Sequence, residues 1–225
     1  MENLQAFQLT KKQKRYMVFK RALDLVFSGI GLIVFFPLAV LIMIVIKCDS
    51  QGPVFFKQTR IGKDKSHFEI WKFRSMRADA LQNVPTHLLE DPEKYITKVG
   101  RFLRKSSLDE LPQLINIFKG EMSFVGPRPA LWNQYDLIEE RDKYGAHEVL
   151  PGLTGLAQIN GRDTLEISTK AMFDGKYVKD FGFRMDMHCF WGTFEPVIRR
   201  KDVIEGIVWE LDKEAVKKDE EKNAQ

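Results

Sequence analysis

Residues 25–46, with the sequence L-V-F-S-G-I-G-L-I-V-F-F-P-L-A-V-L-I-M-I-V-I, contain no charged side chain and constrain the architecture of the whole chain. As one helix, at about 1.5 Å per residue, this segment would reach roughly 33 Å, and a bilayer core is about 30 Å thick. Its length disfavours both a buried core helix and a secretory signal, and no small-x-small cleavage motif follows it. The segment therefore predicts a membrane anchor.

Pro37 lies near the middle of this apolar run, where a proline removes a helix hydrogen bond and kinks the chain. Basic residues flank the run on both sides, so the positive-inside bias favours a cytoplasmic position for both ends. These flanking residues are Lys11, Lys12, Lys14, Arg15, Lys20 and Arg21 before it, and Lys47, Lys57, Arg60, Lys63 and Lys65 after it. The pattern predicts a re-entrant hairpin bent at Phe36 and Pro37. Hydropathy and charge bias alone are equally compatible with a kinked single span.

The overall composition is that of an ordinary globular protein. Of 225 residues, 44% are hydrophobic and 29% are charged, and the formal net charge is +4. The basic residues lie beside the apolar run and among candidate phosphate-binding motifs, so we expect membrane surfaces and anionic substrates as partners and no nucleic acid. Cys48 and Cys189 are far apart, and the histidines show no metal-ligand spacing, which predicts a reducing compartment and no zinc site.

The chemistry is expected in R-F-L-R-K-S-S-L-D-E-L-P-Q-L-I-N-I-F, residues 101–118, which carries the adjacent carboxylates Asp109 and Glu110. Apolar residues follow the acid pair with helical spacing, and they are Leu111, Leu114, Ile115 and Phe118. The pattern predicts an amphipathic helix with the acid pair at its N-terminus. Unpaired N–H groups and the positive end of the helix dipole at this position bind anions and keep carboxylates ionised.

The acid pair also fits a purely structural role, because Ser107-x-x-Glu110 matches a capping box. Taken alone, this motif favours a helix cap over a catalytic site. If Ser107 is the N-cap, Pro112 removes a helix hydrogen bond, whereas with Asp109 as the N-cap it does not. The sequence leaves the register of the helix open.

Two segments rich in aromatic and β-branched residues, V-F-F-K-Q-T-R (residues 54–60) and H-F-E-I-W-K-F-R (residues 67–74), predict a β-hairpin with an exposed basic loop. Four basic residues, Lys57, Arg60, Lys72 and Arg74, are expected to cluster on or beside this sheet. Lysines on strand edges are also common for structural reasons. The hairpin is therefore a candidate anion-binding element.

Two later segments carry arginines in stiff or glycine-rich surroundings. In G-E-M-S-F-V-G-P-R-P, residues 120–129, two prolines and a glycine surround Arg128, which favours a fixed, two-pronged contact with phosphate. P-G-L-T-G-L-A-Q-I-N-G-R, residues 151–162, ends in Arg162, as a loop that approaches a phosphate would. Rigid turns with surface arginines are the structural alternative.

Residues 183–200, F-R-M-D-M-H-C-F-W-G-T-F-E-P-V-I-R-R, mix aromatic residues with arginines, as does a helix that lies in a membrane interface. A core helix is the competing assignment. Asp186 is an exception in this segment, because an acid there requires a partner such as a cation.

Taken together and in this order, several motifs resemble the bacterial sugar transferase family, the monotopic polyprenol-phosphate phosphoglycosyl transferases. The motifs are K-R-A-L-D-L, G-P-V-F-F-K-Q-T-R-I-G, W-K-F-R-S-M, S-L-D-E-L-P-Q-L-I-N, G-E-M-S-F-V-G-P-R-P, P-G-L-T-G-L-A-Q-I-N-G-R and the Y-V…D run that ends near Asp186. The resemblance extends over about residues 20–200 and favours a catalytic role for the acid pair. We expect the minimal catalytic form, since no multi-span bundle precedes residue 20. The chain departs from the family at its hinge, which is Phe36-Pro37 instead of Ser-Pro.

The resemblance implies transfer of a phosphosugar from a UDP-sugar to a polyprenol phosphate, such as undecaprenyl phosphate, with release of UMP and a requirement for Mg²⁺. It implies that Asp109 is the nucleophile that forms an aspartyl-phosphosugar intermediate and that Glu110 is a metal ligand. The expected phosphate-binding residues are Lys72, Arg104, Arg128 and Arg162, with Asp186 as a second acid near the metal or the basic cluster.

The expected fold is an α-rich α+β fold with a re-entrant membrane helix, a small β-hairpin or sheet, and interfacial amphipathic helices around a cytoplasmic catalytic domain. We expect a basic N-terminus and anchor over residues 1–50, the catalytic domain over residues 51–202 and a charged tail over residues 203–225. The implied location is the cytoplasmic face of the bacterial inner membrane, at the first membrane step of glycan assembly. The sequence indicates no oligomeric state.

Two other classes of protein remain open. A membrane-bound glycosyltransferase would release UDP, but the chain has no D-x-D motif and carries the acid pair. A non-catalytic membrane scaffold would keep the anchor without needing the acids. Among transferases, Gly161-Arg162-Asp163 and Phe173-Asp174-Gly175 resemble members that use acetamido sugars more than members that use glucose or galactose.

Overall fold

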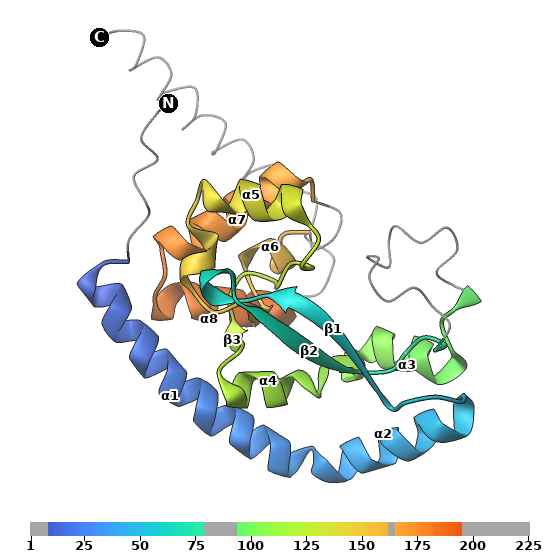
Figure 1. Ribbon diagram of the computed structural model, residues 1–225. Coiled ribbons are helices and arrows are strands. Elements are labelled where there is room, and N and C mark those ends of the chain that lie inside the picture. The colour runs from blue at the N-terminus through green and yellow to red at the C-terminus, as the bar shows by residue number, and fades with distance from the viewer. Residues whose placement is uncertain (1–8, 79–93, 162–164, 195–225) are drawn as a thin grey trace, which may run out of the picture.

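Two long helices form a bent arm beneath the rest of the molecule in the computed structural model, which describes residues 9–78, 94–161 and 165–194. These helices are α1 (Lys11–Val34) and α2 (Phe36–Asp49), and the other described elements lie above them in Figure 1. The expected helix-rich fold with small sheets is confirmed. The predicted charged tail lies outside the described residues, and the division into anchor and catalytic domain stays a prediction.

The predicted bend in the apolar run is present, one residue earlier than expected. The directions of α1 and α2 differ by 59°, and Phe35, with φ −88° and ψ 0°, separates them. Pro37 lies in the first turn of α2, where its missing N–H leaves no bond unmade, and its ring would clash with the Ile33 carbonyl of a straight helix. Within the described residues, no single helix has the length and apolar character to cross a membrane; α1 and α2 have them only as a pair.

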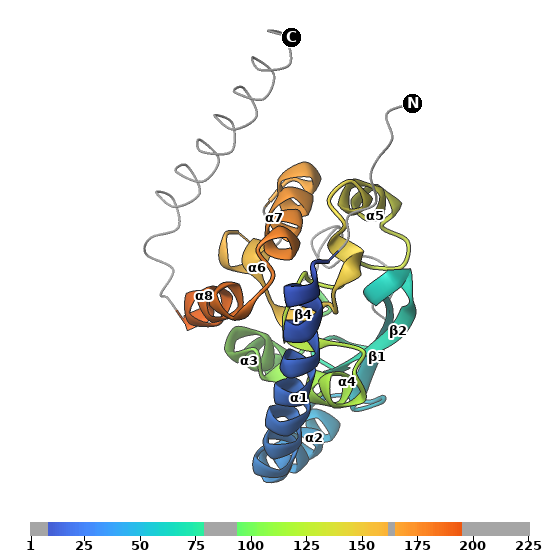
Figure 2. The same cartoon turned by 90° about the vertical axis from the view of Figure 1, so that its left-hand side faces the viewer.

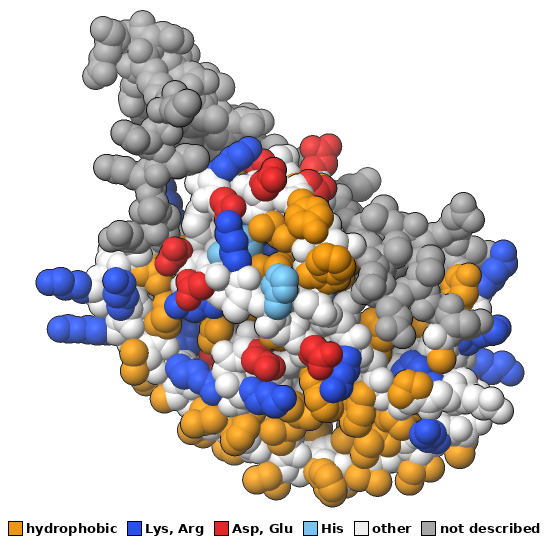
Figure 3. Space-filling view, in the orientation of Figure 1, with side chains coloured by type: hydrophobic (Ala, Val, Ile, Leu, Met, Phe, Trp, Pro, Cys, Tyr) orange, Lys and Arg blue, Asp and Glu red, His pale blue; other side chains and the backbone are white. Residues whose placement is uncertain are grey.

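Helix α1 buries polar side chains and exposes apolar ones, which reverses the usual pattern of a helix packed on a soluble domain. Its buried residues are Gln13, Lys20, Asp24 and Ser28. Its exposed apolar residues include Val26, Phe27, Ile30, Ile33 and Val34. Apolar side chains from α1 and α2 cover the lower face of the molecule in Figure 3. A contiguous apolar surface of this kind marks an interaction face.

The polar side of α1 holds the helix to the domain. Lys20 forms a buried ion pair with Asp186, and a carboxylate oxygen of Asp24 accepts the Phe124 N–H at 3.2 Å. The Arg21 guanidinium donates to the carbonyls of Ile117 and Phe118 at 2.6 and 2.7 Å. These bonds to α8, β3 and the end of α4 add to the apolar contacts that Tyr16, Met17 and Leu32 of α1 make with the domain.

The predicted hairpin is confirmed. Strands β1 (Phe55–Ile61) and β2 (His67–Phe73) pair in antiparallel fashion, from Phe55 opposite Phe73 to Ile61 opposite His67. The short 3-10 helix η1 (Lys63–Lys65) forms the basic loop between them. The hairpin lies above the junction of the bent arm in Figure 1.

The expected basic cluster on the hairpin is divided between its two faces, because side chains alternate along a strand. Arg60 and Lys72 lie on one face, opposite Phe68 and Phe56 in the ladder. Lys57 lies on the other face, with its ammonium 4.1 Å from the centre of the Trp71 ring. Arg74 lies beyond β2 and donates to the backbone carbonyls of residues 50 and 51. The four basic residues therefore have different local contacts, although all four border one cavity.

The remaining elements form the upper part of the molecule and the flanks of the hairpin. They are α3 (Lys98–Ser106), η4 (Leu108–Glu110), α4 (Gln113–Lys119), β3 (Ser123–Val125), α5 (Tyr135–Asp142), η5 (Ala146–Glu148), β4 (Gly152–Thr154), α6 (Leu156–Ile159), α7 (Ile167–Lys179) and α8 (Phe183–Phe194). Strands β3 and β4 form a parallel pair that the sequence did not predict. Figure 2 shows α8 on one side of α1 and the hairpin on the other.

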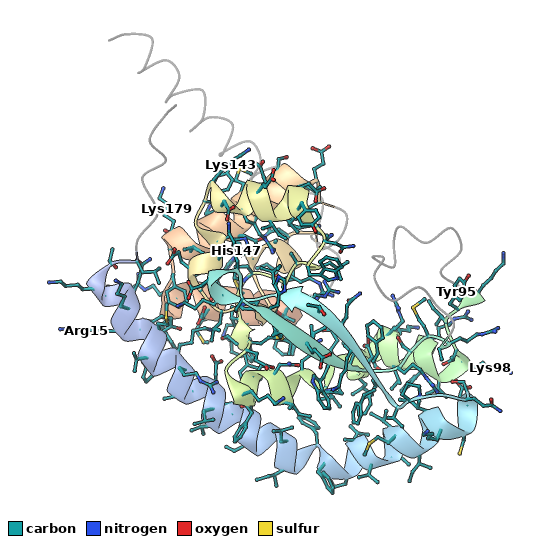
Figure 4. All side chains as sticks on the ribbon, viewed as in Figure 1. Arg15, Tyr95, Lys98, Lys143, His147 and Lys179 are labelled. Atoms are coloured by element: carbon teal, nitrogen blue, oxygen red, sulfur yellow. The ribbon has the colours of Figure 1, made fainter. Side chains whose placement is uncertain are left out.

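Helix α8 combines the two alternatives proposed for its sequence. Its aromatic residues Phe183, Phe190, Trp191 and Phe194 are exposed, whereas Asp186 and Cys189 are buried. Cys189 joins a core that includes the fully buried side chains of Phe173, Tyr177 and Val178 from α7. Lys143 and Lys179 point into solvent on the side of this core away from α2 (Figure 4). The side of the domain that carries Lys143 and Lys179 thus lies away from α2 of the apolar arm.

Helix α4 lies between the hairpin and α1, and Asn116 connects it to β2. The predicted apolar face is only partly correct, because Leu114 is buried but Phe118 is 46% exposed. The fully buried Asn116 amide accepts the Trp71 N–H at 3.0 Å and donates to the Glu69 carbonyl at 2.7 Å. A polar contact therefore fixes the helix that follows the acid pair.

Replacing Asn116 with alanine should lower the free energy of unfolding by about 1–3 kcal/mol, because two partly buried backbone groups of β2, the Trp71 N–H and the Glu69 carbonyl, lose their side-chain partner. Denaturant unfolding in detergent, followed by circular dichroism, measures this change. Glu69→Gln is the matched control: its side chain is 60% exposed, and it should change stability by no more than about 0.5 kcal/mol. Equal destabilisation by both variants would contradict the role of the amide.

Candidate active site

Asp109 and Glu110 lie in the 3-10 turn η4, between α3 and α4, and neither predicted helix register is correct. Ser107 has a left-handed backbone, with φ 58° and ψ 16°, which ends α3 and redirects the chain. The Glu110 N–H bonds to the Ser107 backbone carbonyl at 3.2 Å, and the Ser107 hydroxyl makes no capping bond. The N-cap of α4 is Pro112, which has no N–H to lose. The capping-box interpretation is therefore wrong, and the acid pair lies just before the helix.

The carboxyl group of Asp109 is largely removed from solvent, with 9% of the residue exposed. Burial raises the pKa of Asp109, the positive charge of Lys72 opposes the rise, Glu110 adds to it, and Arg104 opposes it. A desolvated carboxylate between two cations is more reactive toward phosphorus than a fully hydrated one, provided that it is ionised.

Glu110 joins the acid pair to two cations from distant parts of the chain. Its Oε1 accepts a hydrogen bond from the Lys72 ammonium at 2.7 Å and lies 3.5 Å from an Nη2 of Arg128. Burial lowers the pKa of Lys72, while the charge of Glu110 opposes this change. The structure thus brings together a strand residue, a turn residue and a loop residue that the sequence proposed for one site.

The segment Pro127, Arg128, Pro129 and Ala130 is fixed through its carbonyl groups. The four consecutive carbonyl oxygens accept hydrogen bonds from four different groups: the Gly152 N–H, the Arg141 guanidinium, the Arg60 guanidinium and the Ile61 N–H, at 2.8, 2.8, 3.0 and 2.9 Å. The two prolines cannot donate, so acceptance is the main way to hold this backbone. The backbone around Arg128 is therefore held by these hydrogen bonds as well as by its two prolines and glycine.

One cavity of about 1350 Å³ connects these residues. Four predicted site residues lie on its wall with Asp109, namely Lys72, Arg104, Glu110 and Arg128. The wall also includes Phe35 at the bend of the arm and the exposed Phe190 and Phe194 of α8. The cavity is larger than an ordinary small-ligand pocket and joins charged groups to apolar ones. Arg162 lies outside the described residues.

The structure does not place Asp186 at this cavity. The Asp186 carboxylate accepts hydrogen bonds from the hydroxyls of Tyr16 and Tyr177 at 2.6 and 2.7 Å and pairs with Lys20. The cation expected beside this acid is therefore Lys20, and these three donors occupy both carboxylate oxygens. The sequence analysis expected Asp186 near the metal or the basic cluster, whereas in the structure its carboxylate faces α1 and α7 and does not line the cavity.

The residues at the cavity fit Mg²⁺ through the acid pair. Within the described ranges, no three His, Cys, Asp or Glu side chains gather in a way that could hold a metal ion. Mg²⁺ usually takes only one or two carboxylates and completes its shell with water and substrate phosphates. Glu110, together with Asp109, would supply this number of protein ligands, and the cavity leaves room for phosphates.

Arg141 lines the cavity and Asp174 lies behind it, and the sequence analysis gave neither residue a role of this kind. Arg141 lies on the cavity wall and is 3% exposed. The sequence feature that could have indicated its burial was its spacing. Arg141 follows Leu137 by four residues, and both are buried in α5. Asp174, from the motif compared with acetamido-sugar enzymes, is fully buried against Arg141, and its neighbour Phe173 is in the core. Neither Phe173 nor Asp174 lies on the cavity wall.

Comparison with known proteins agrees with the geometry. The bacterial sugar transferase family model matches residues 15–200. A UDP-glucose:undecaprenyl-phosphate glucose-1-phosphate transferase of Escherichia coli is 43% identical over 176 residues, which are 75% of this chain and 38% of that protein. The uncharacterized sugar transferase EpsL of Bacillus subtilis is 40% identical over 85% of this chain and 91% of its own.

An undecaprenyl-phosphate galactose phosphotransferase of Salmonella typhimurium is 35% identical over 85% of this chain and 42% of its own length. The chain thus spans about two fifths of the length of several relatives, including the E. coli and Salmonella proteins, and most of the length of EpsL. Because the family model covers most of the sequence and the identities exceed 30%, this chain belongs to the bacterial sugar transferase family.

Proposed function

We propose that this chain transfers a phosphosugar from a UDP-sugar to a polyprenol phosphate, with undecaprenyl phosphate as acceptor and UMP as leaving product. The observation that carries the proposal is the buried carboxylate of Asp109 on the same cavity wall as Glu110, Lys72 and Arg128. Support also comes from the relatives whose names specify sugar-phosphate transfer involving undecaprenyl phosphate.

The proposed reaction has two half reactions at one phosphorus atom. A carboxylate oxygen of Asp109 attacks the β-phosphorus of the UDP-sugar, and the bond from this phosphorus to the oxygen shared with the α-phosphate breaks, so that UMP leaves. A phosphate oxygen of the polyprenol phosphate then attacks the same phosphorus. The bond to Asp109 breaks, which restores the carboxylate and yields a polyprenyl diphosphosugar.

The surrounding cations stabilise the charge that develops during these steps. Lys72 and Arg128 flank Glu110 at 2.7 and 3.5 Å, and Arg104 lies close enough to oppose the rise in the pKa of Asp109. Fixed positive groups of this kind neutralise non-bridging phosphate oxygens and the leaving UMP. Bound Mg²⁺ would supply further neutralisation of the diphosphate, held by Glu110 with Asp109. Arg162 stays a candidate for the same task.

The apolar arm supports a location at the cytoplasmic face of the bacterial inner membrane. Its exposed apolar face fits a lipid phase, and the Phe35 bend fits a re-entrant hairpin that enters one leaflet. The cavity reaches Phe35 and the aromatic side of α8, so a lipid-borne phosphate and a soluble nucleotide sugar could meet there. We propose this monotopic arrangement as the physical reason for joining the arm to the site.

The identity of the sugar stays a prediction. The named relatives use glucose or galactose, whereas the sequence resemblance favoured an acetamido sugar. Because Phe173 and Asp174 are buried and do not line the cavity, we expect the choice of sugar to depend on the residues of the cavity wall. A screen of UDP-sugars for UMP release decides between these classes, and release of UDP instead would identify an ordinary glycosyltransferase.

Replacement of Asp109 with asparagine should lower turnover by on the order of 10³-fold or more, because the nucleophile is lost. Glu110→Gln should lower the metal-dependent rate by about 10²-fold. Incubation of the unmodified protein with UDP-sugar alone should give a phosphosugar adduct, detected by mass spectrometry on the peptide that contains Asp109. An active Asp109→Asn variant, or an adduct on another residue, would refute this assignment.

The activity should fall as the pH is lowered through the pKa of Asp109, because only the ionised carboxylate attacks phosphorus. Burial raises this pKa, so the acidic limb of kcat/KM should lie above the range of an ordinary aspartate. Lys72→Met removes the charge that holds the pKa down and should shift the limb to higher pH. Lys65→Met, at the exposed loop of the same hairpin, should leave the limb in place. An unshifted limb in Lys72→Met would contradict the coupling.

The topology can be tested with Gln5→Cys and Lys65→Cys, each in a background lacking Cys48 and Cys189. A re-entrant arm should shield both cysteines from a membrane-impermeant thiol reagent in intact cells. Pro37→Leu restores the option of a straight helix, a change worth about 3 kcal/mol in a helix interior, and should expose one flank. Labelling of residue 5 from outside the cell without this substitution would exclude the re-entrant arrangement but leave the acid-pair chemistry intact.

A further inference from the structure

We propose that Arg141 is a positioning residue, which is held by Asp174 and fixes the backbone that presents Arg128 to the acid pair. This inference rests on the proposed function, since it assigns Arg141 to the same reaction. Arg141 acts on the acid pair indirectly, through Arg128. The contacts run from α7, through α5, to the loop after β3.

The first link is the ion pair between Arg141 and Asp174. The Nε and Nη2 atoms of Arg141 donate to the same carboxylate oxygen of Asp174 at 2.8 and 2.6 Å. The side chains of Arg141 and Asp174 are only 3% and 1% exposed. A charge pair this deeply buried is costly to desolvate, and apolar residues of similar volume often stabilise a fold equally well. Stability alone is therefore a weak explanation for the pair.

The second link is the bond from Arg141 to the loop. The same Nη2 atom donates to the backbone carbonyl of Arg128 at 2.8 Å. One planar guanidinium thus contacts a carboxylate and a carbonyl at fixed angles. Lysine has a single ammonium on a flexible stem and cannot reproduce this fork. Asp174 sets the orientation of Arg141, and Arg141 sets the position of the Arg128 carbonyl.

The third link is the Arg128 side chain, which reaches across the cavity wall to Glu110 at 3.5 Å. Its side chain is 38% exposed, so few packing contacts orient it. The precision of this cation must come largely from its backbone. The neighbouring carbonyls are also held, but the Arg128 carbonyl itself depends on Arg141. Loss of the fork should therefore displace the Arg128 guanidinium.

A double-mutant cycle tests the proposal, with initial rates of UMP release from a UDP-sugar and undecaprenyl phosphate. Arg141→Lys should lower kcat by on the order of 10²-fold, the cost of a small misplacement of a catalytic group. In the Arg128→Gln background, the same change should lower kcat by less than about twofold, because there is no guanidinium left to position. An equal fold-loss in both backgrounds, or full activity of Arg141→Lys, would overturn the proposal.

A second readout does not depend on activity. Hydrogen–deuterium exchange of the peptide spanning residues 126–133 should accelerate in Arg141→Lys, because the loop loses one of its holding bonds. Unchanged exchange in Arg141→Lys would overturn the proposal, whether or not the unmodified chain releases UMP. Failure of the unmodified chain to release UMP would by itself defeat only the proposed function. The matched control is Asp142→Asn, next to Arg141 on α5, which breaks an exposed ion pair with Lys65 and should change neither readout.

If Arg141→Lys does not fold, the neutral pair Arg141→Gln with Asp174→Asn takes its place in both measurements. It removes both buried charges together and so avoids leaving one of them unpaired. Its expected outcomes are the same, because neither amide restores the fork between Asp174 and the loop. A neutral pair that retains kcat and slow exchange would overturn the proposal.

Discussion

The structure depends on the fact that α1 must pack with its polar side. A helix that exposes Phe27, Ile30 and Ile33 has only a few apolar side chains left for the domain, among them Tyr16, Met17 and Leu32. The domain is therefore attached through Lys20, Arg21 and Asp24, each bonded to a different element. Such bonds are directional, so they fix the rotation and depth of the helix more narrowly than apolar packing would. The height of the cavity above the arm follows from them.

The site is assembled by backbone features as much as by side chains. Strand alternation places Lys72 on the face of the hairpin toward the acid pair, and a left-handed Ser107 turns Asp109 and Glu110 out of the preceding helix. Two prolines leave the Arg128 loop with few donors, so other elements hold it by its carbonyls. The charges converge because each of three short segments has its geometry fixed locally.

Much of this could be predicted from the sequence where a local pattern determines the result. The apolar run with Pro37, the aromatic and β-branched content of the hairpin and the helical spacing after Asp109 each predicted an element, because each pattern depends on neighbours within a few residues. The register at Ser107 could not be predicted, because two local rules, capping and helix termination, competed there. The parallel pairing of β3 with β4 could not be predicted either, because strands of three residues show almost no periodicity in their sequence.

The long-range contacts were harder still to predict. Asp186 was expected near the metal, and its true partners, Lys20, Tyr16 and Tyr177, come from two other helices. Arg141 belongs to none of the motifs described in the sequence analysis, and its partner Asp174 comes from α7. Resemblance to a family identifies which residues are chemically interesting, but only the fold determines which of them meet.

The ion pair between Lys20 and Asp186 also has a consequence for biosynthesis. The two residues are 166 positions apart, and a ribosome adds about 5–20 residues per second, so α1 emerges roughly ten to thirty seconds before its partner. During this time the apolar side of α1 is already complete, while Lys20 does not yet have Asp186 to neutralise its charge. Each newly synthesised chain thus begins with a positively charged amphipathic helix. The charge of Lys20 is neutralised only when α8, which carries Asp186, has been synthesised.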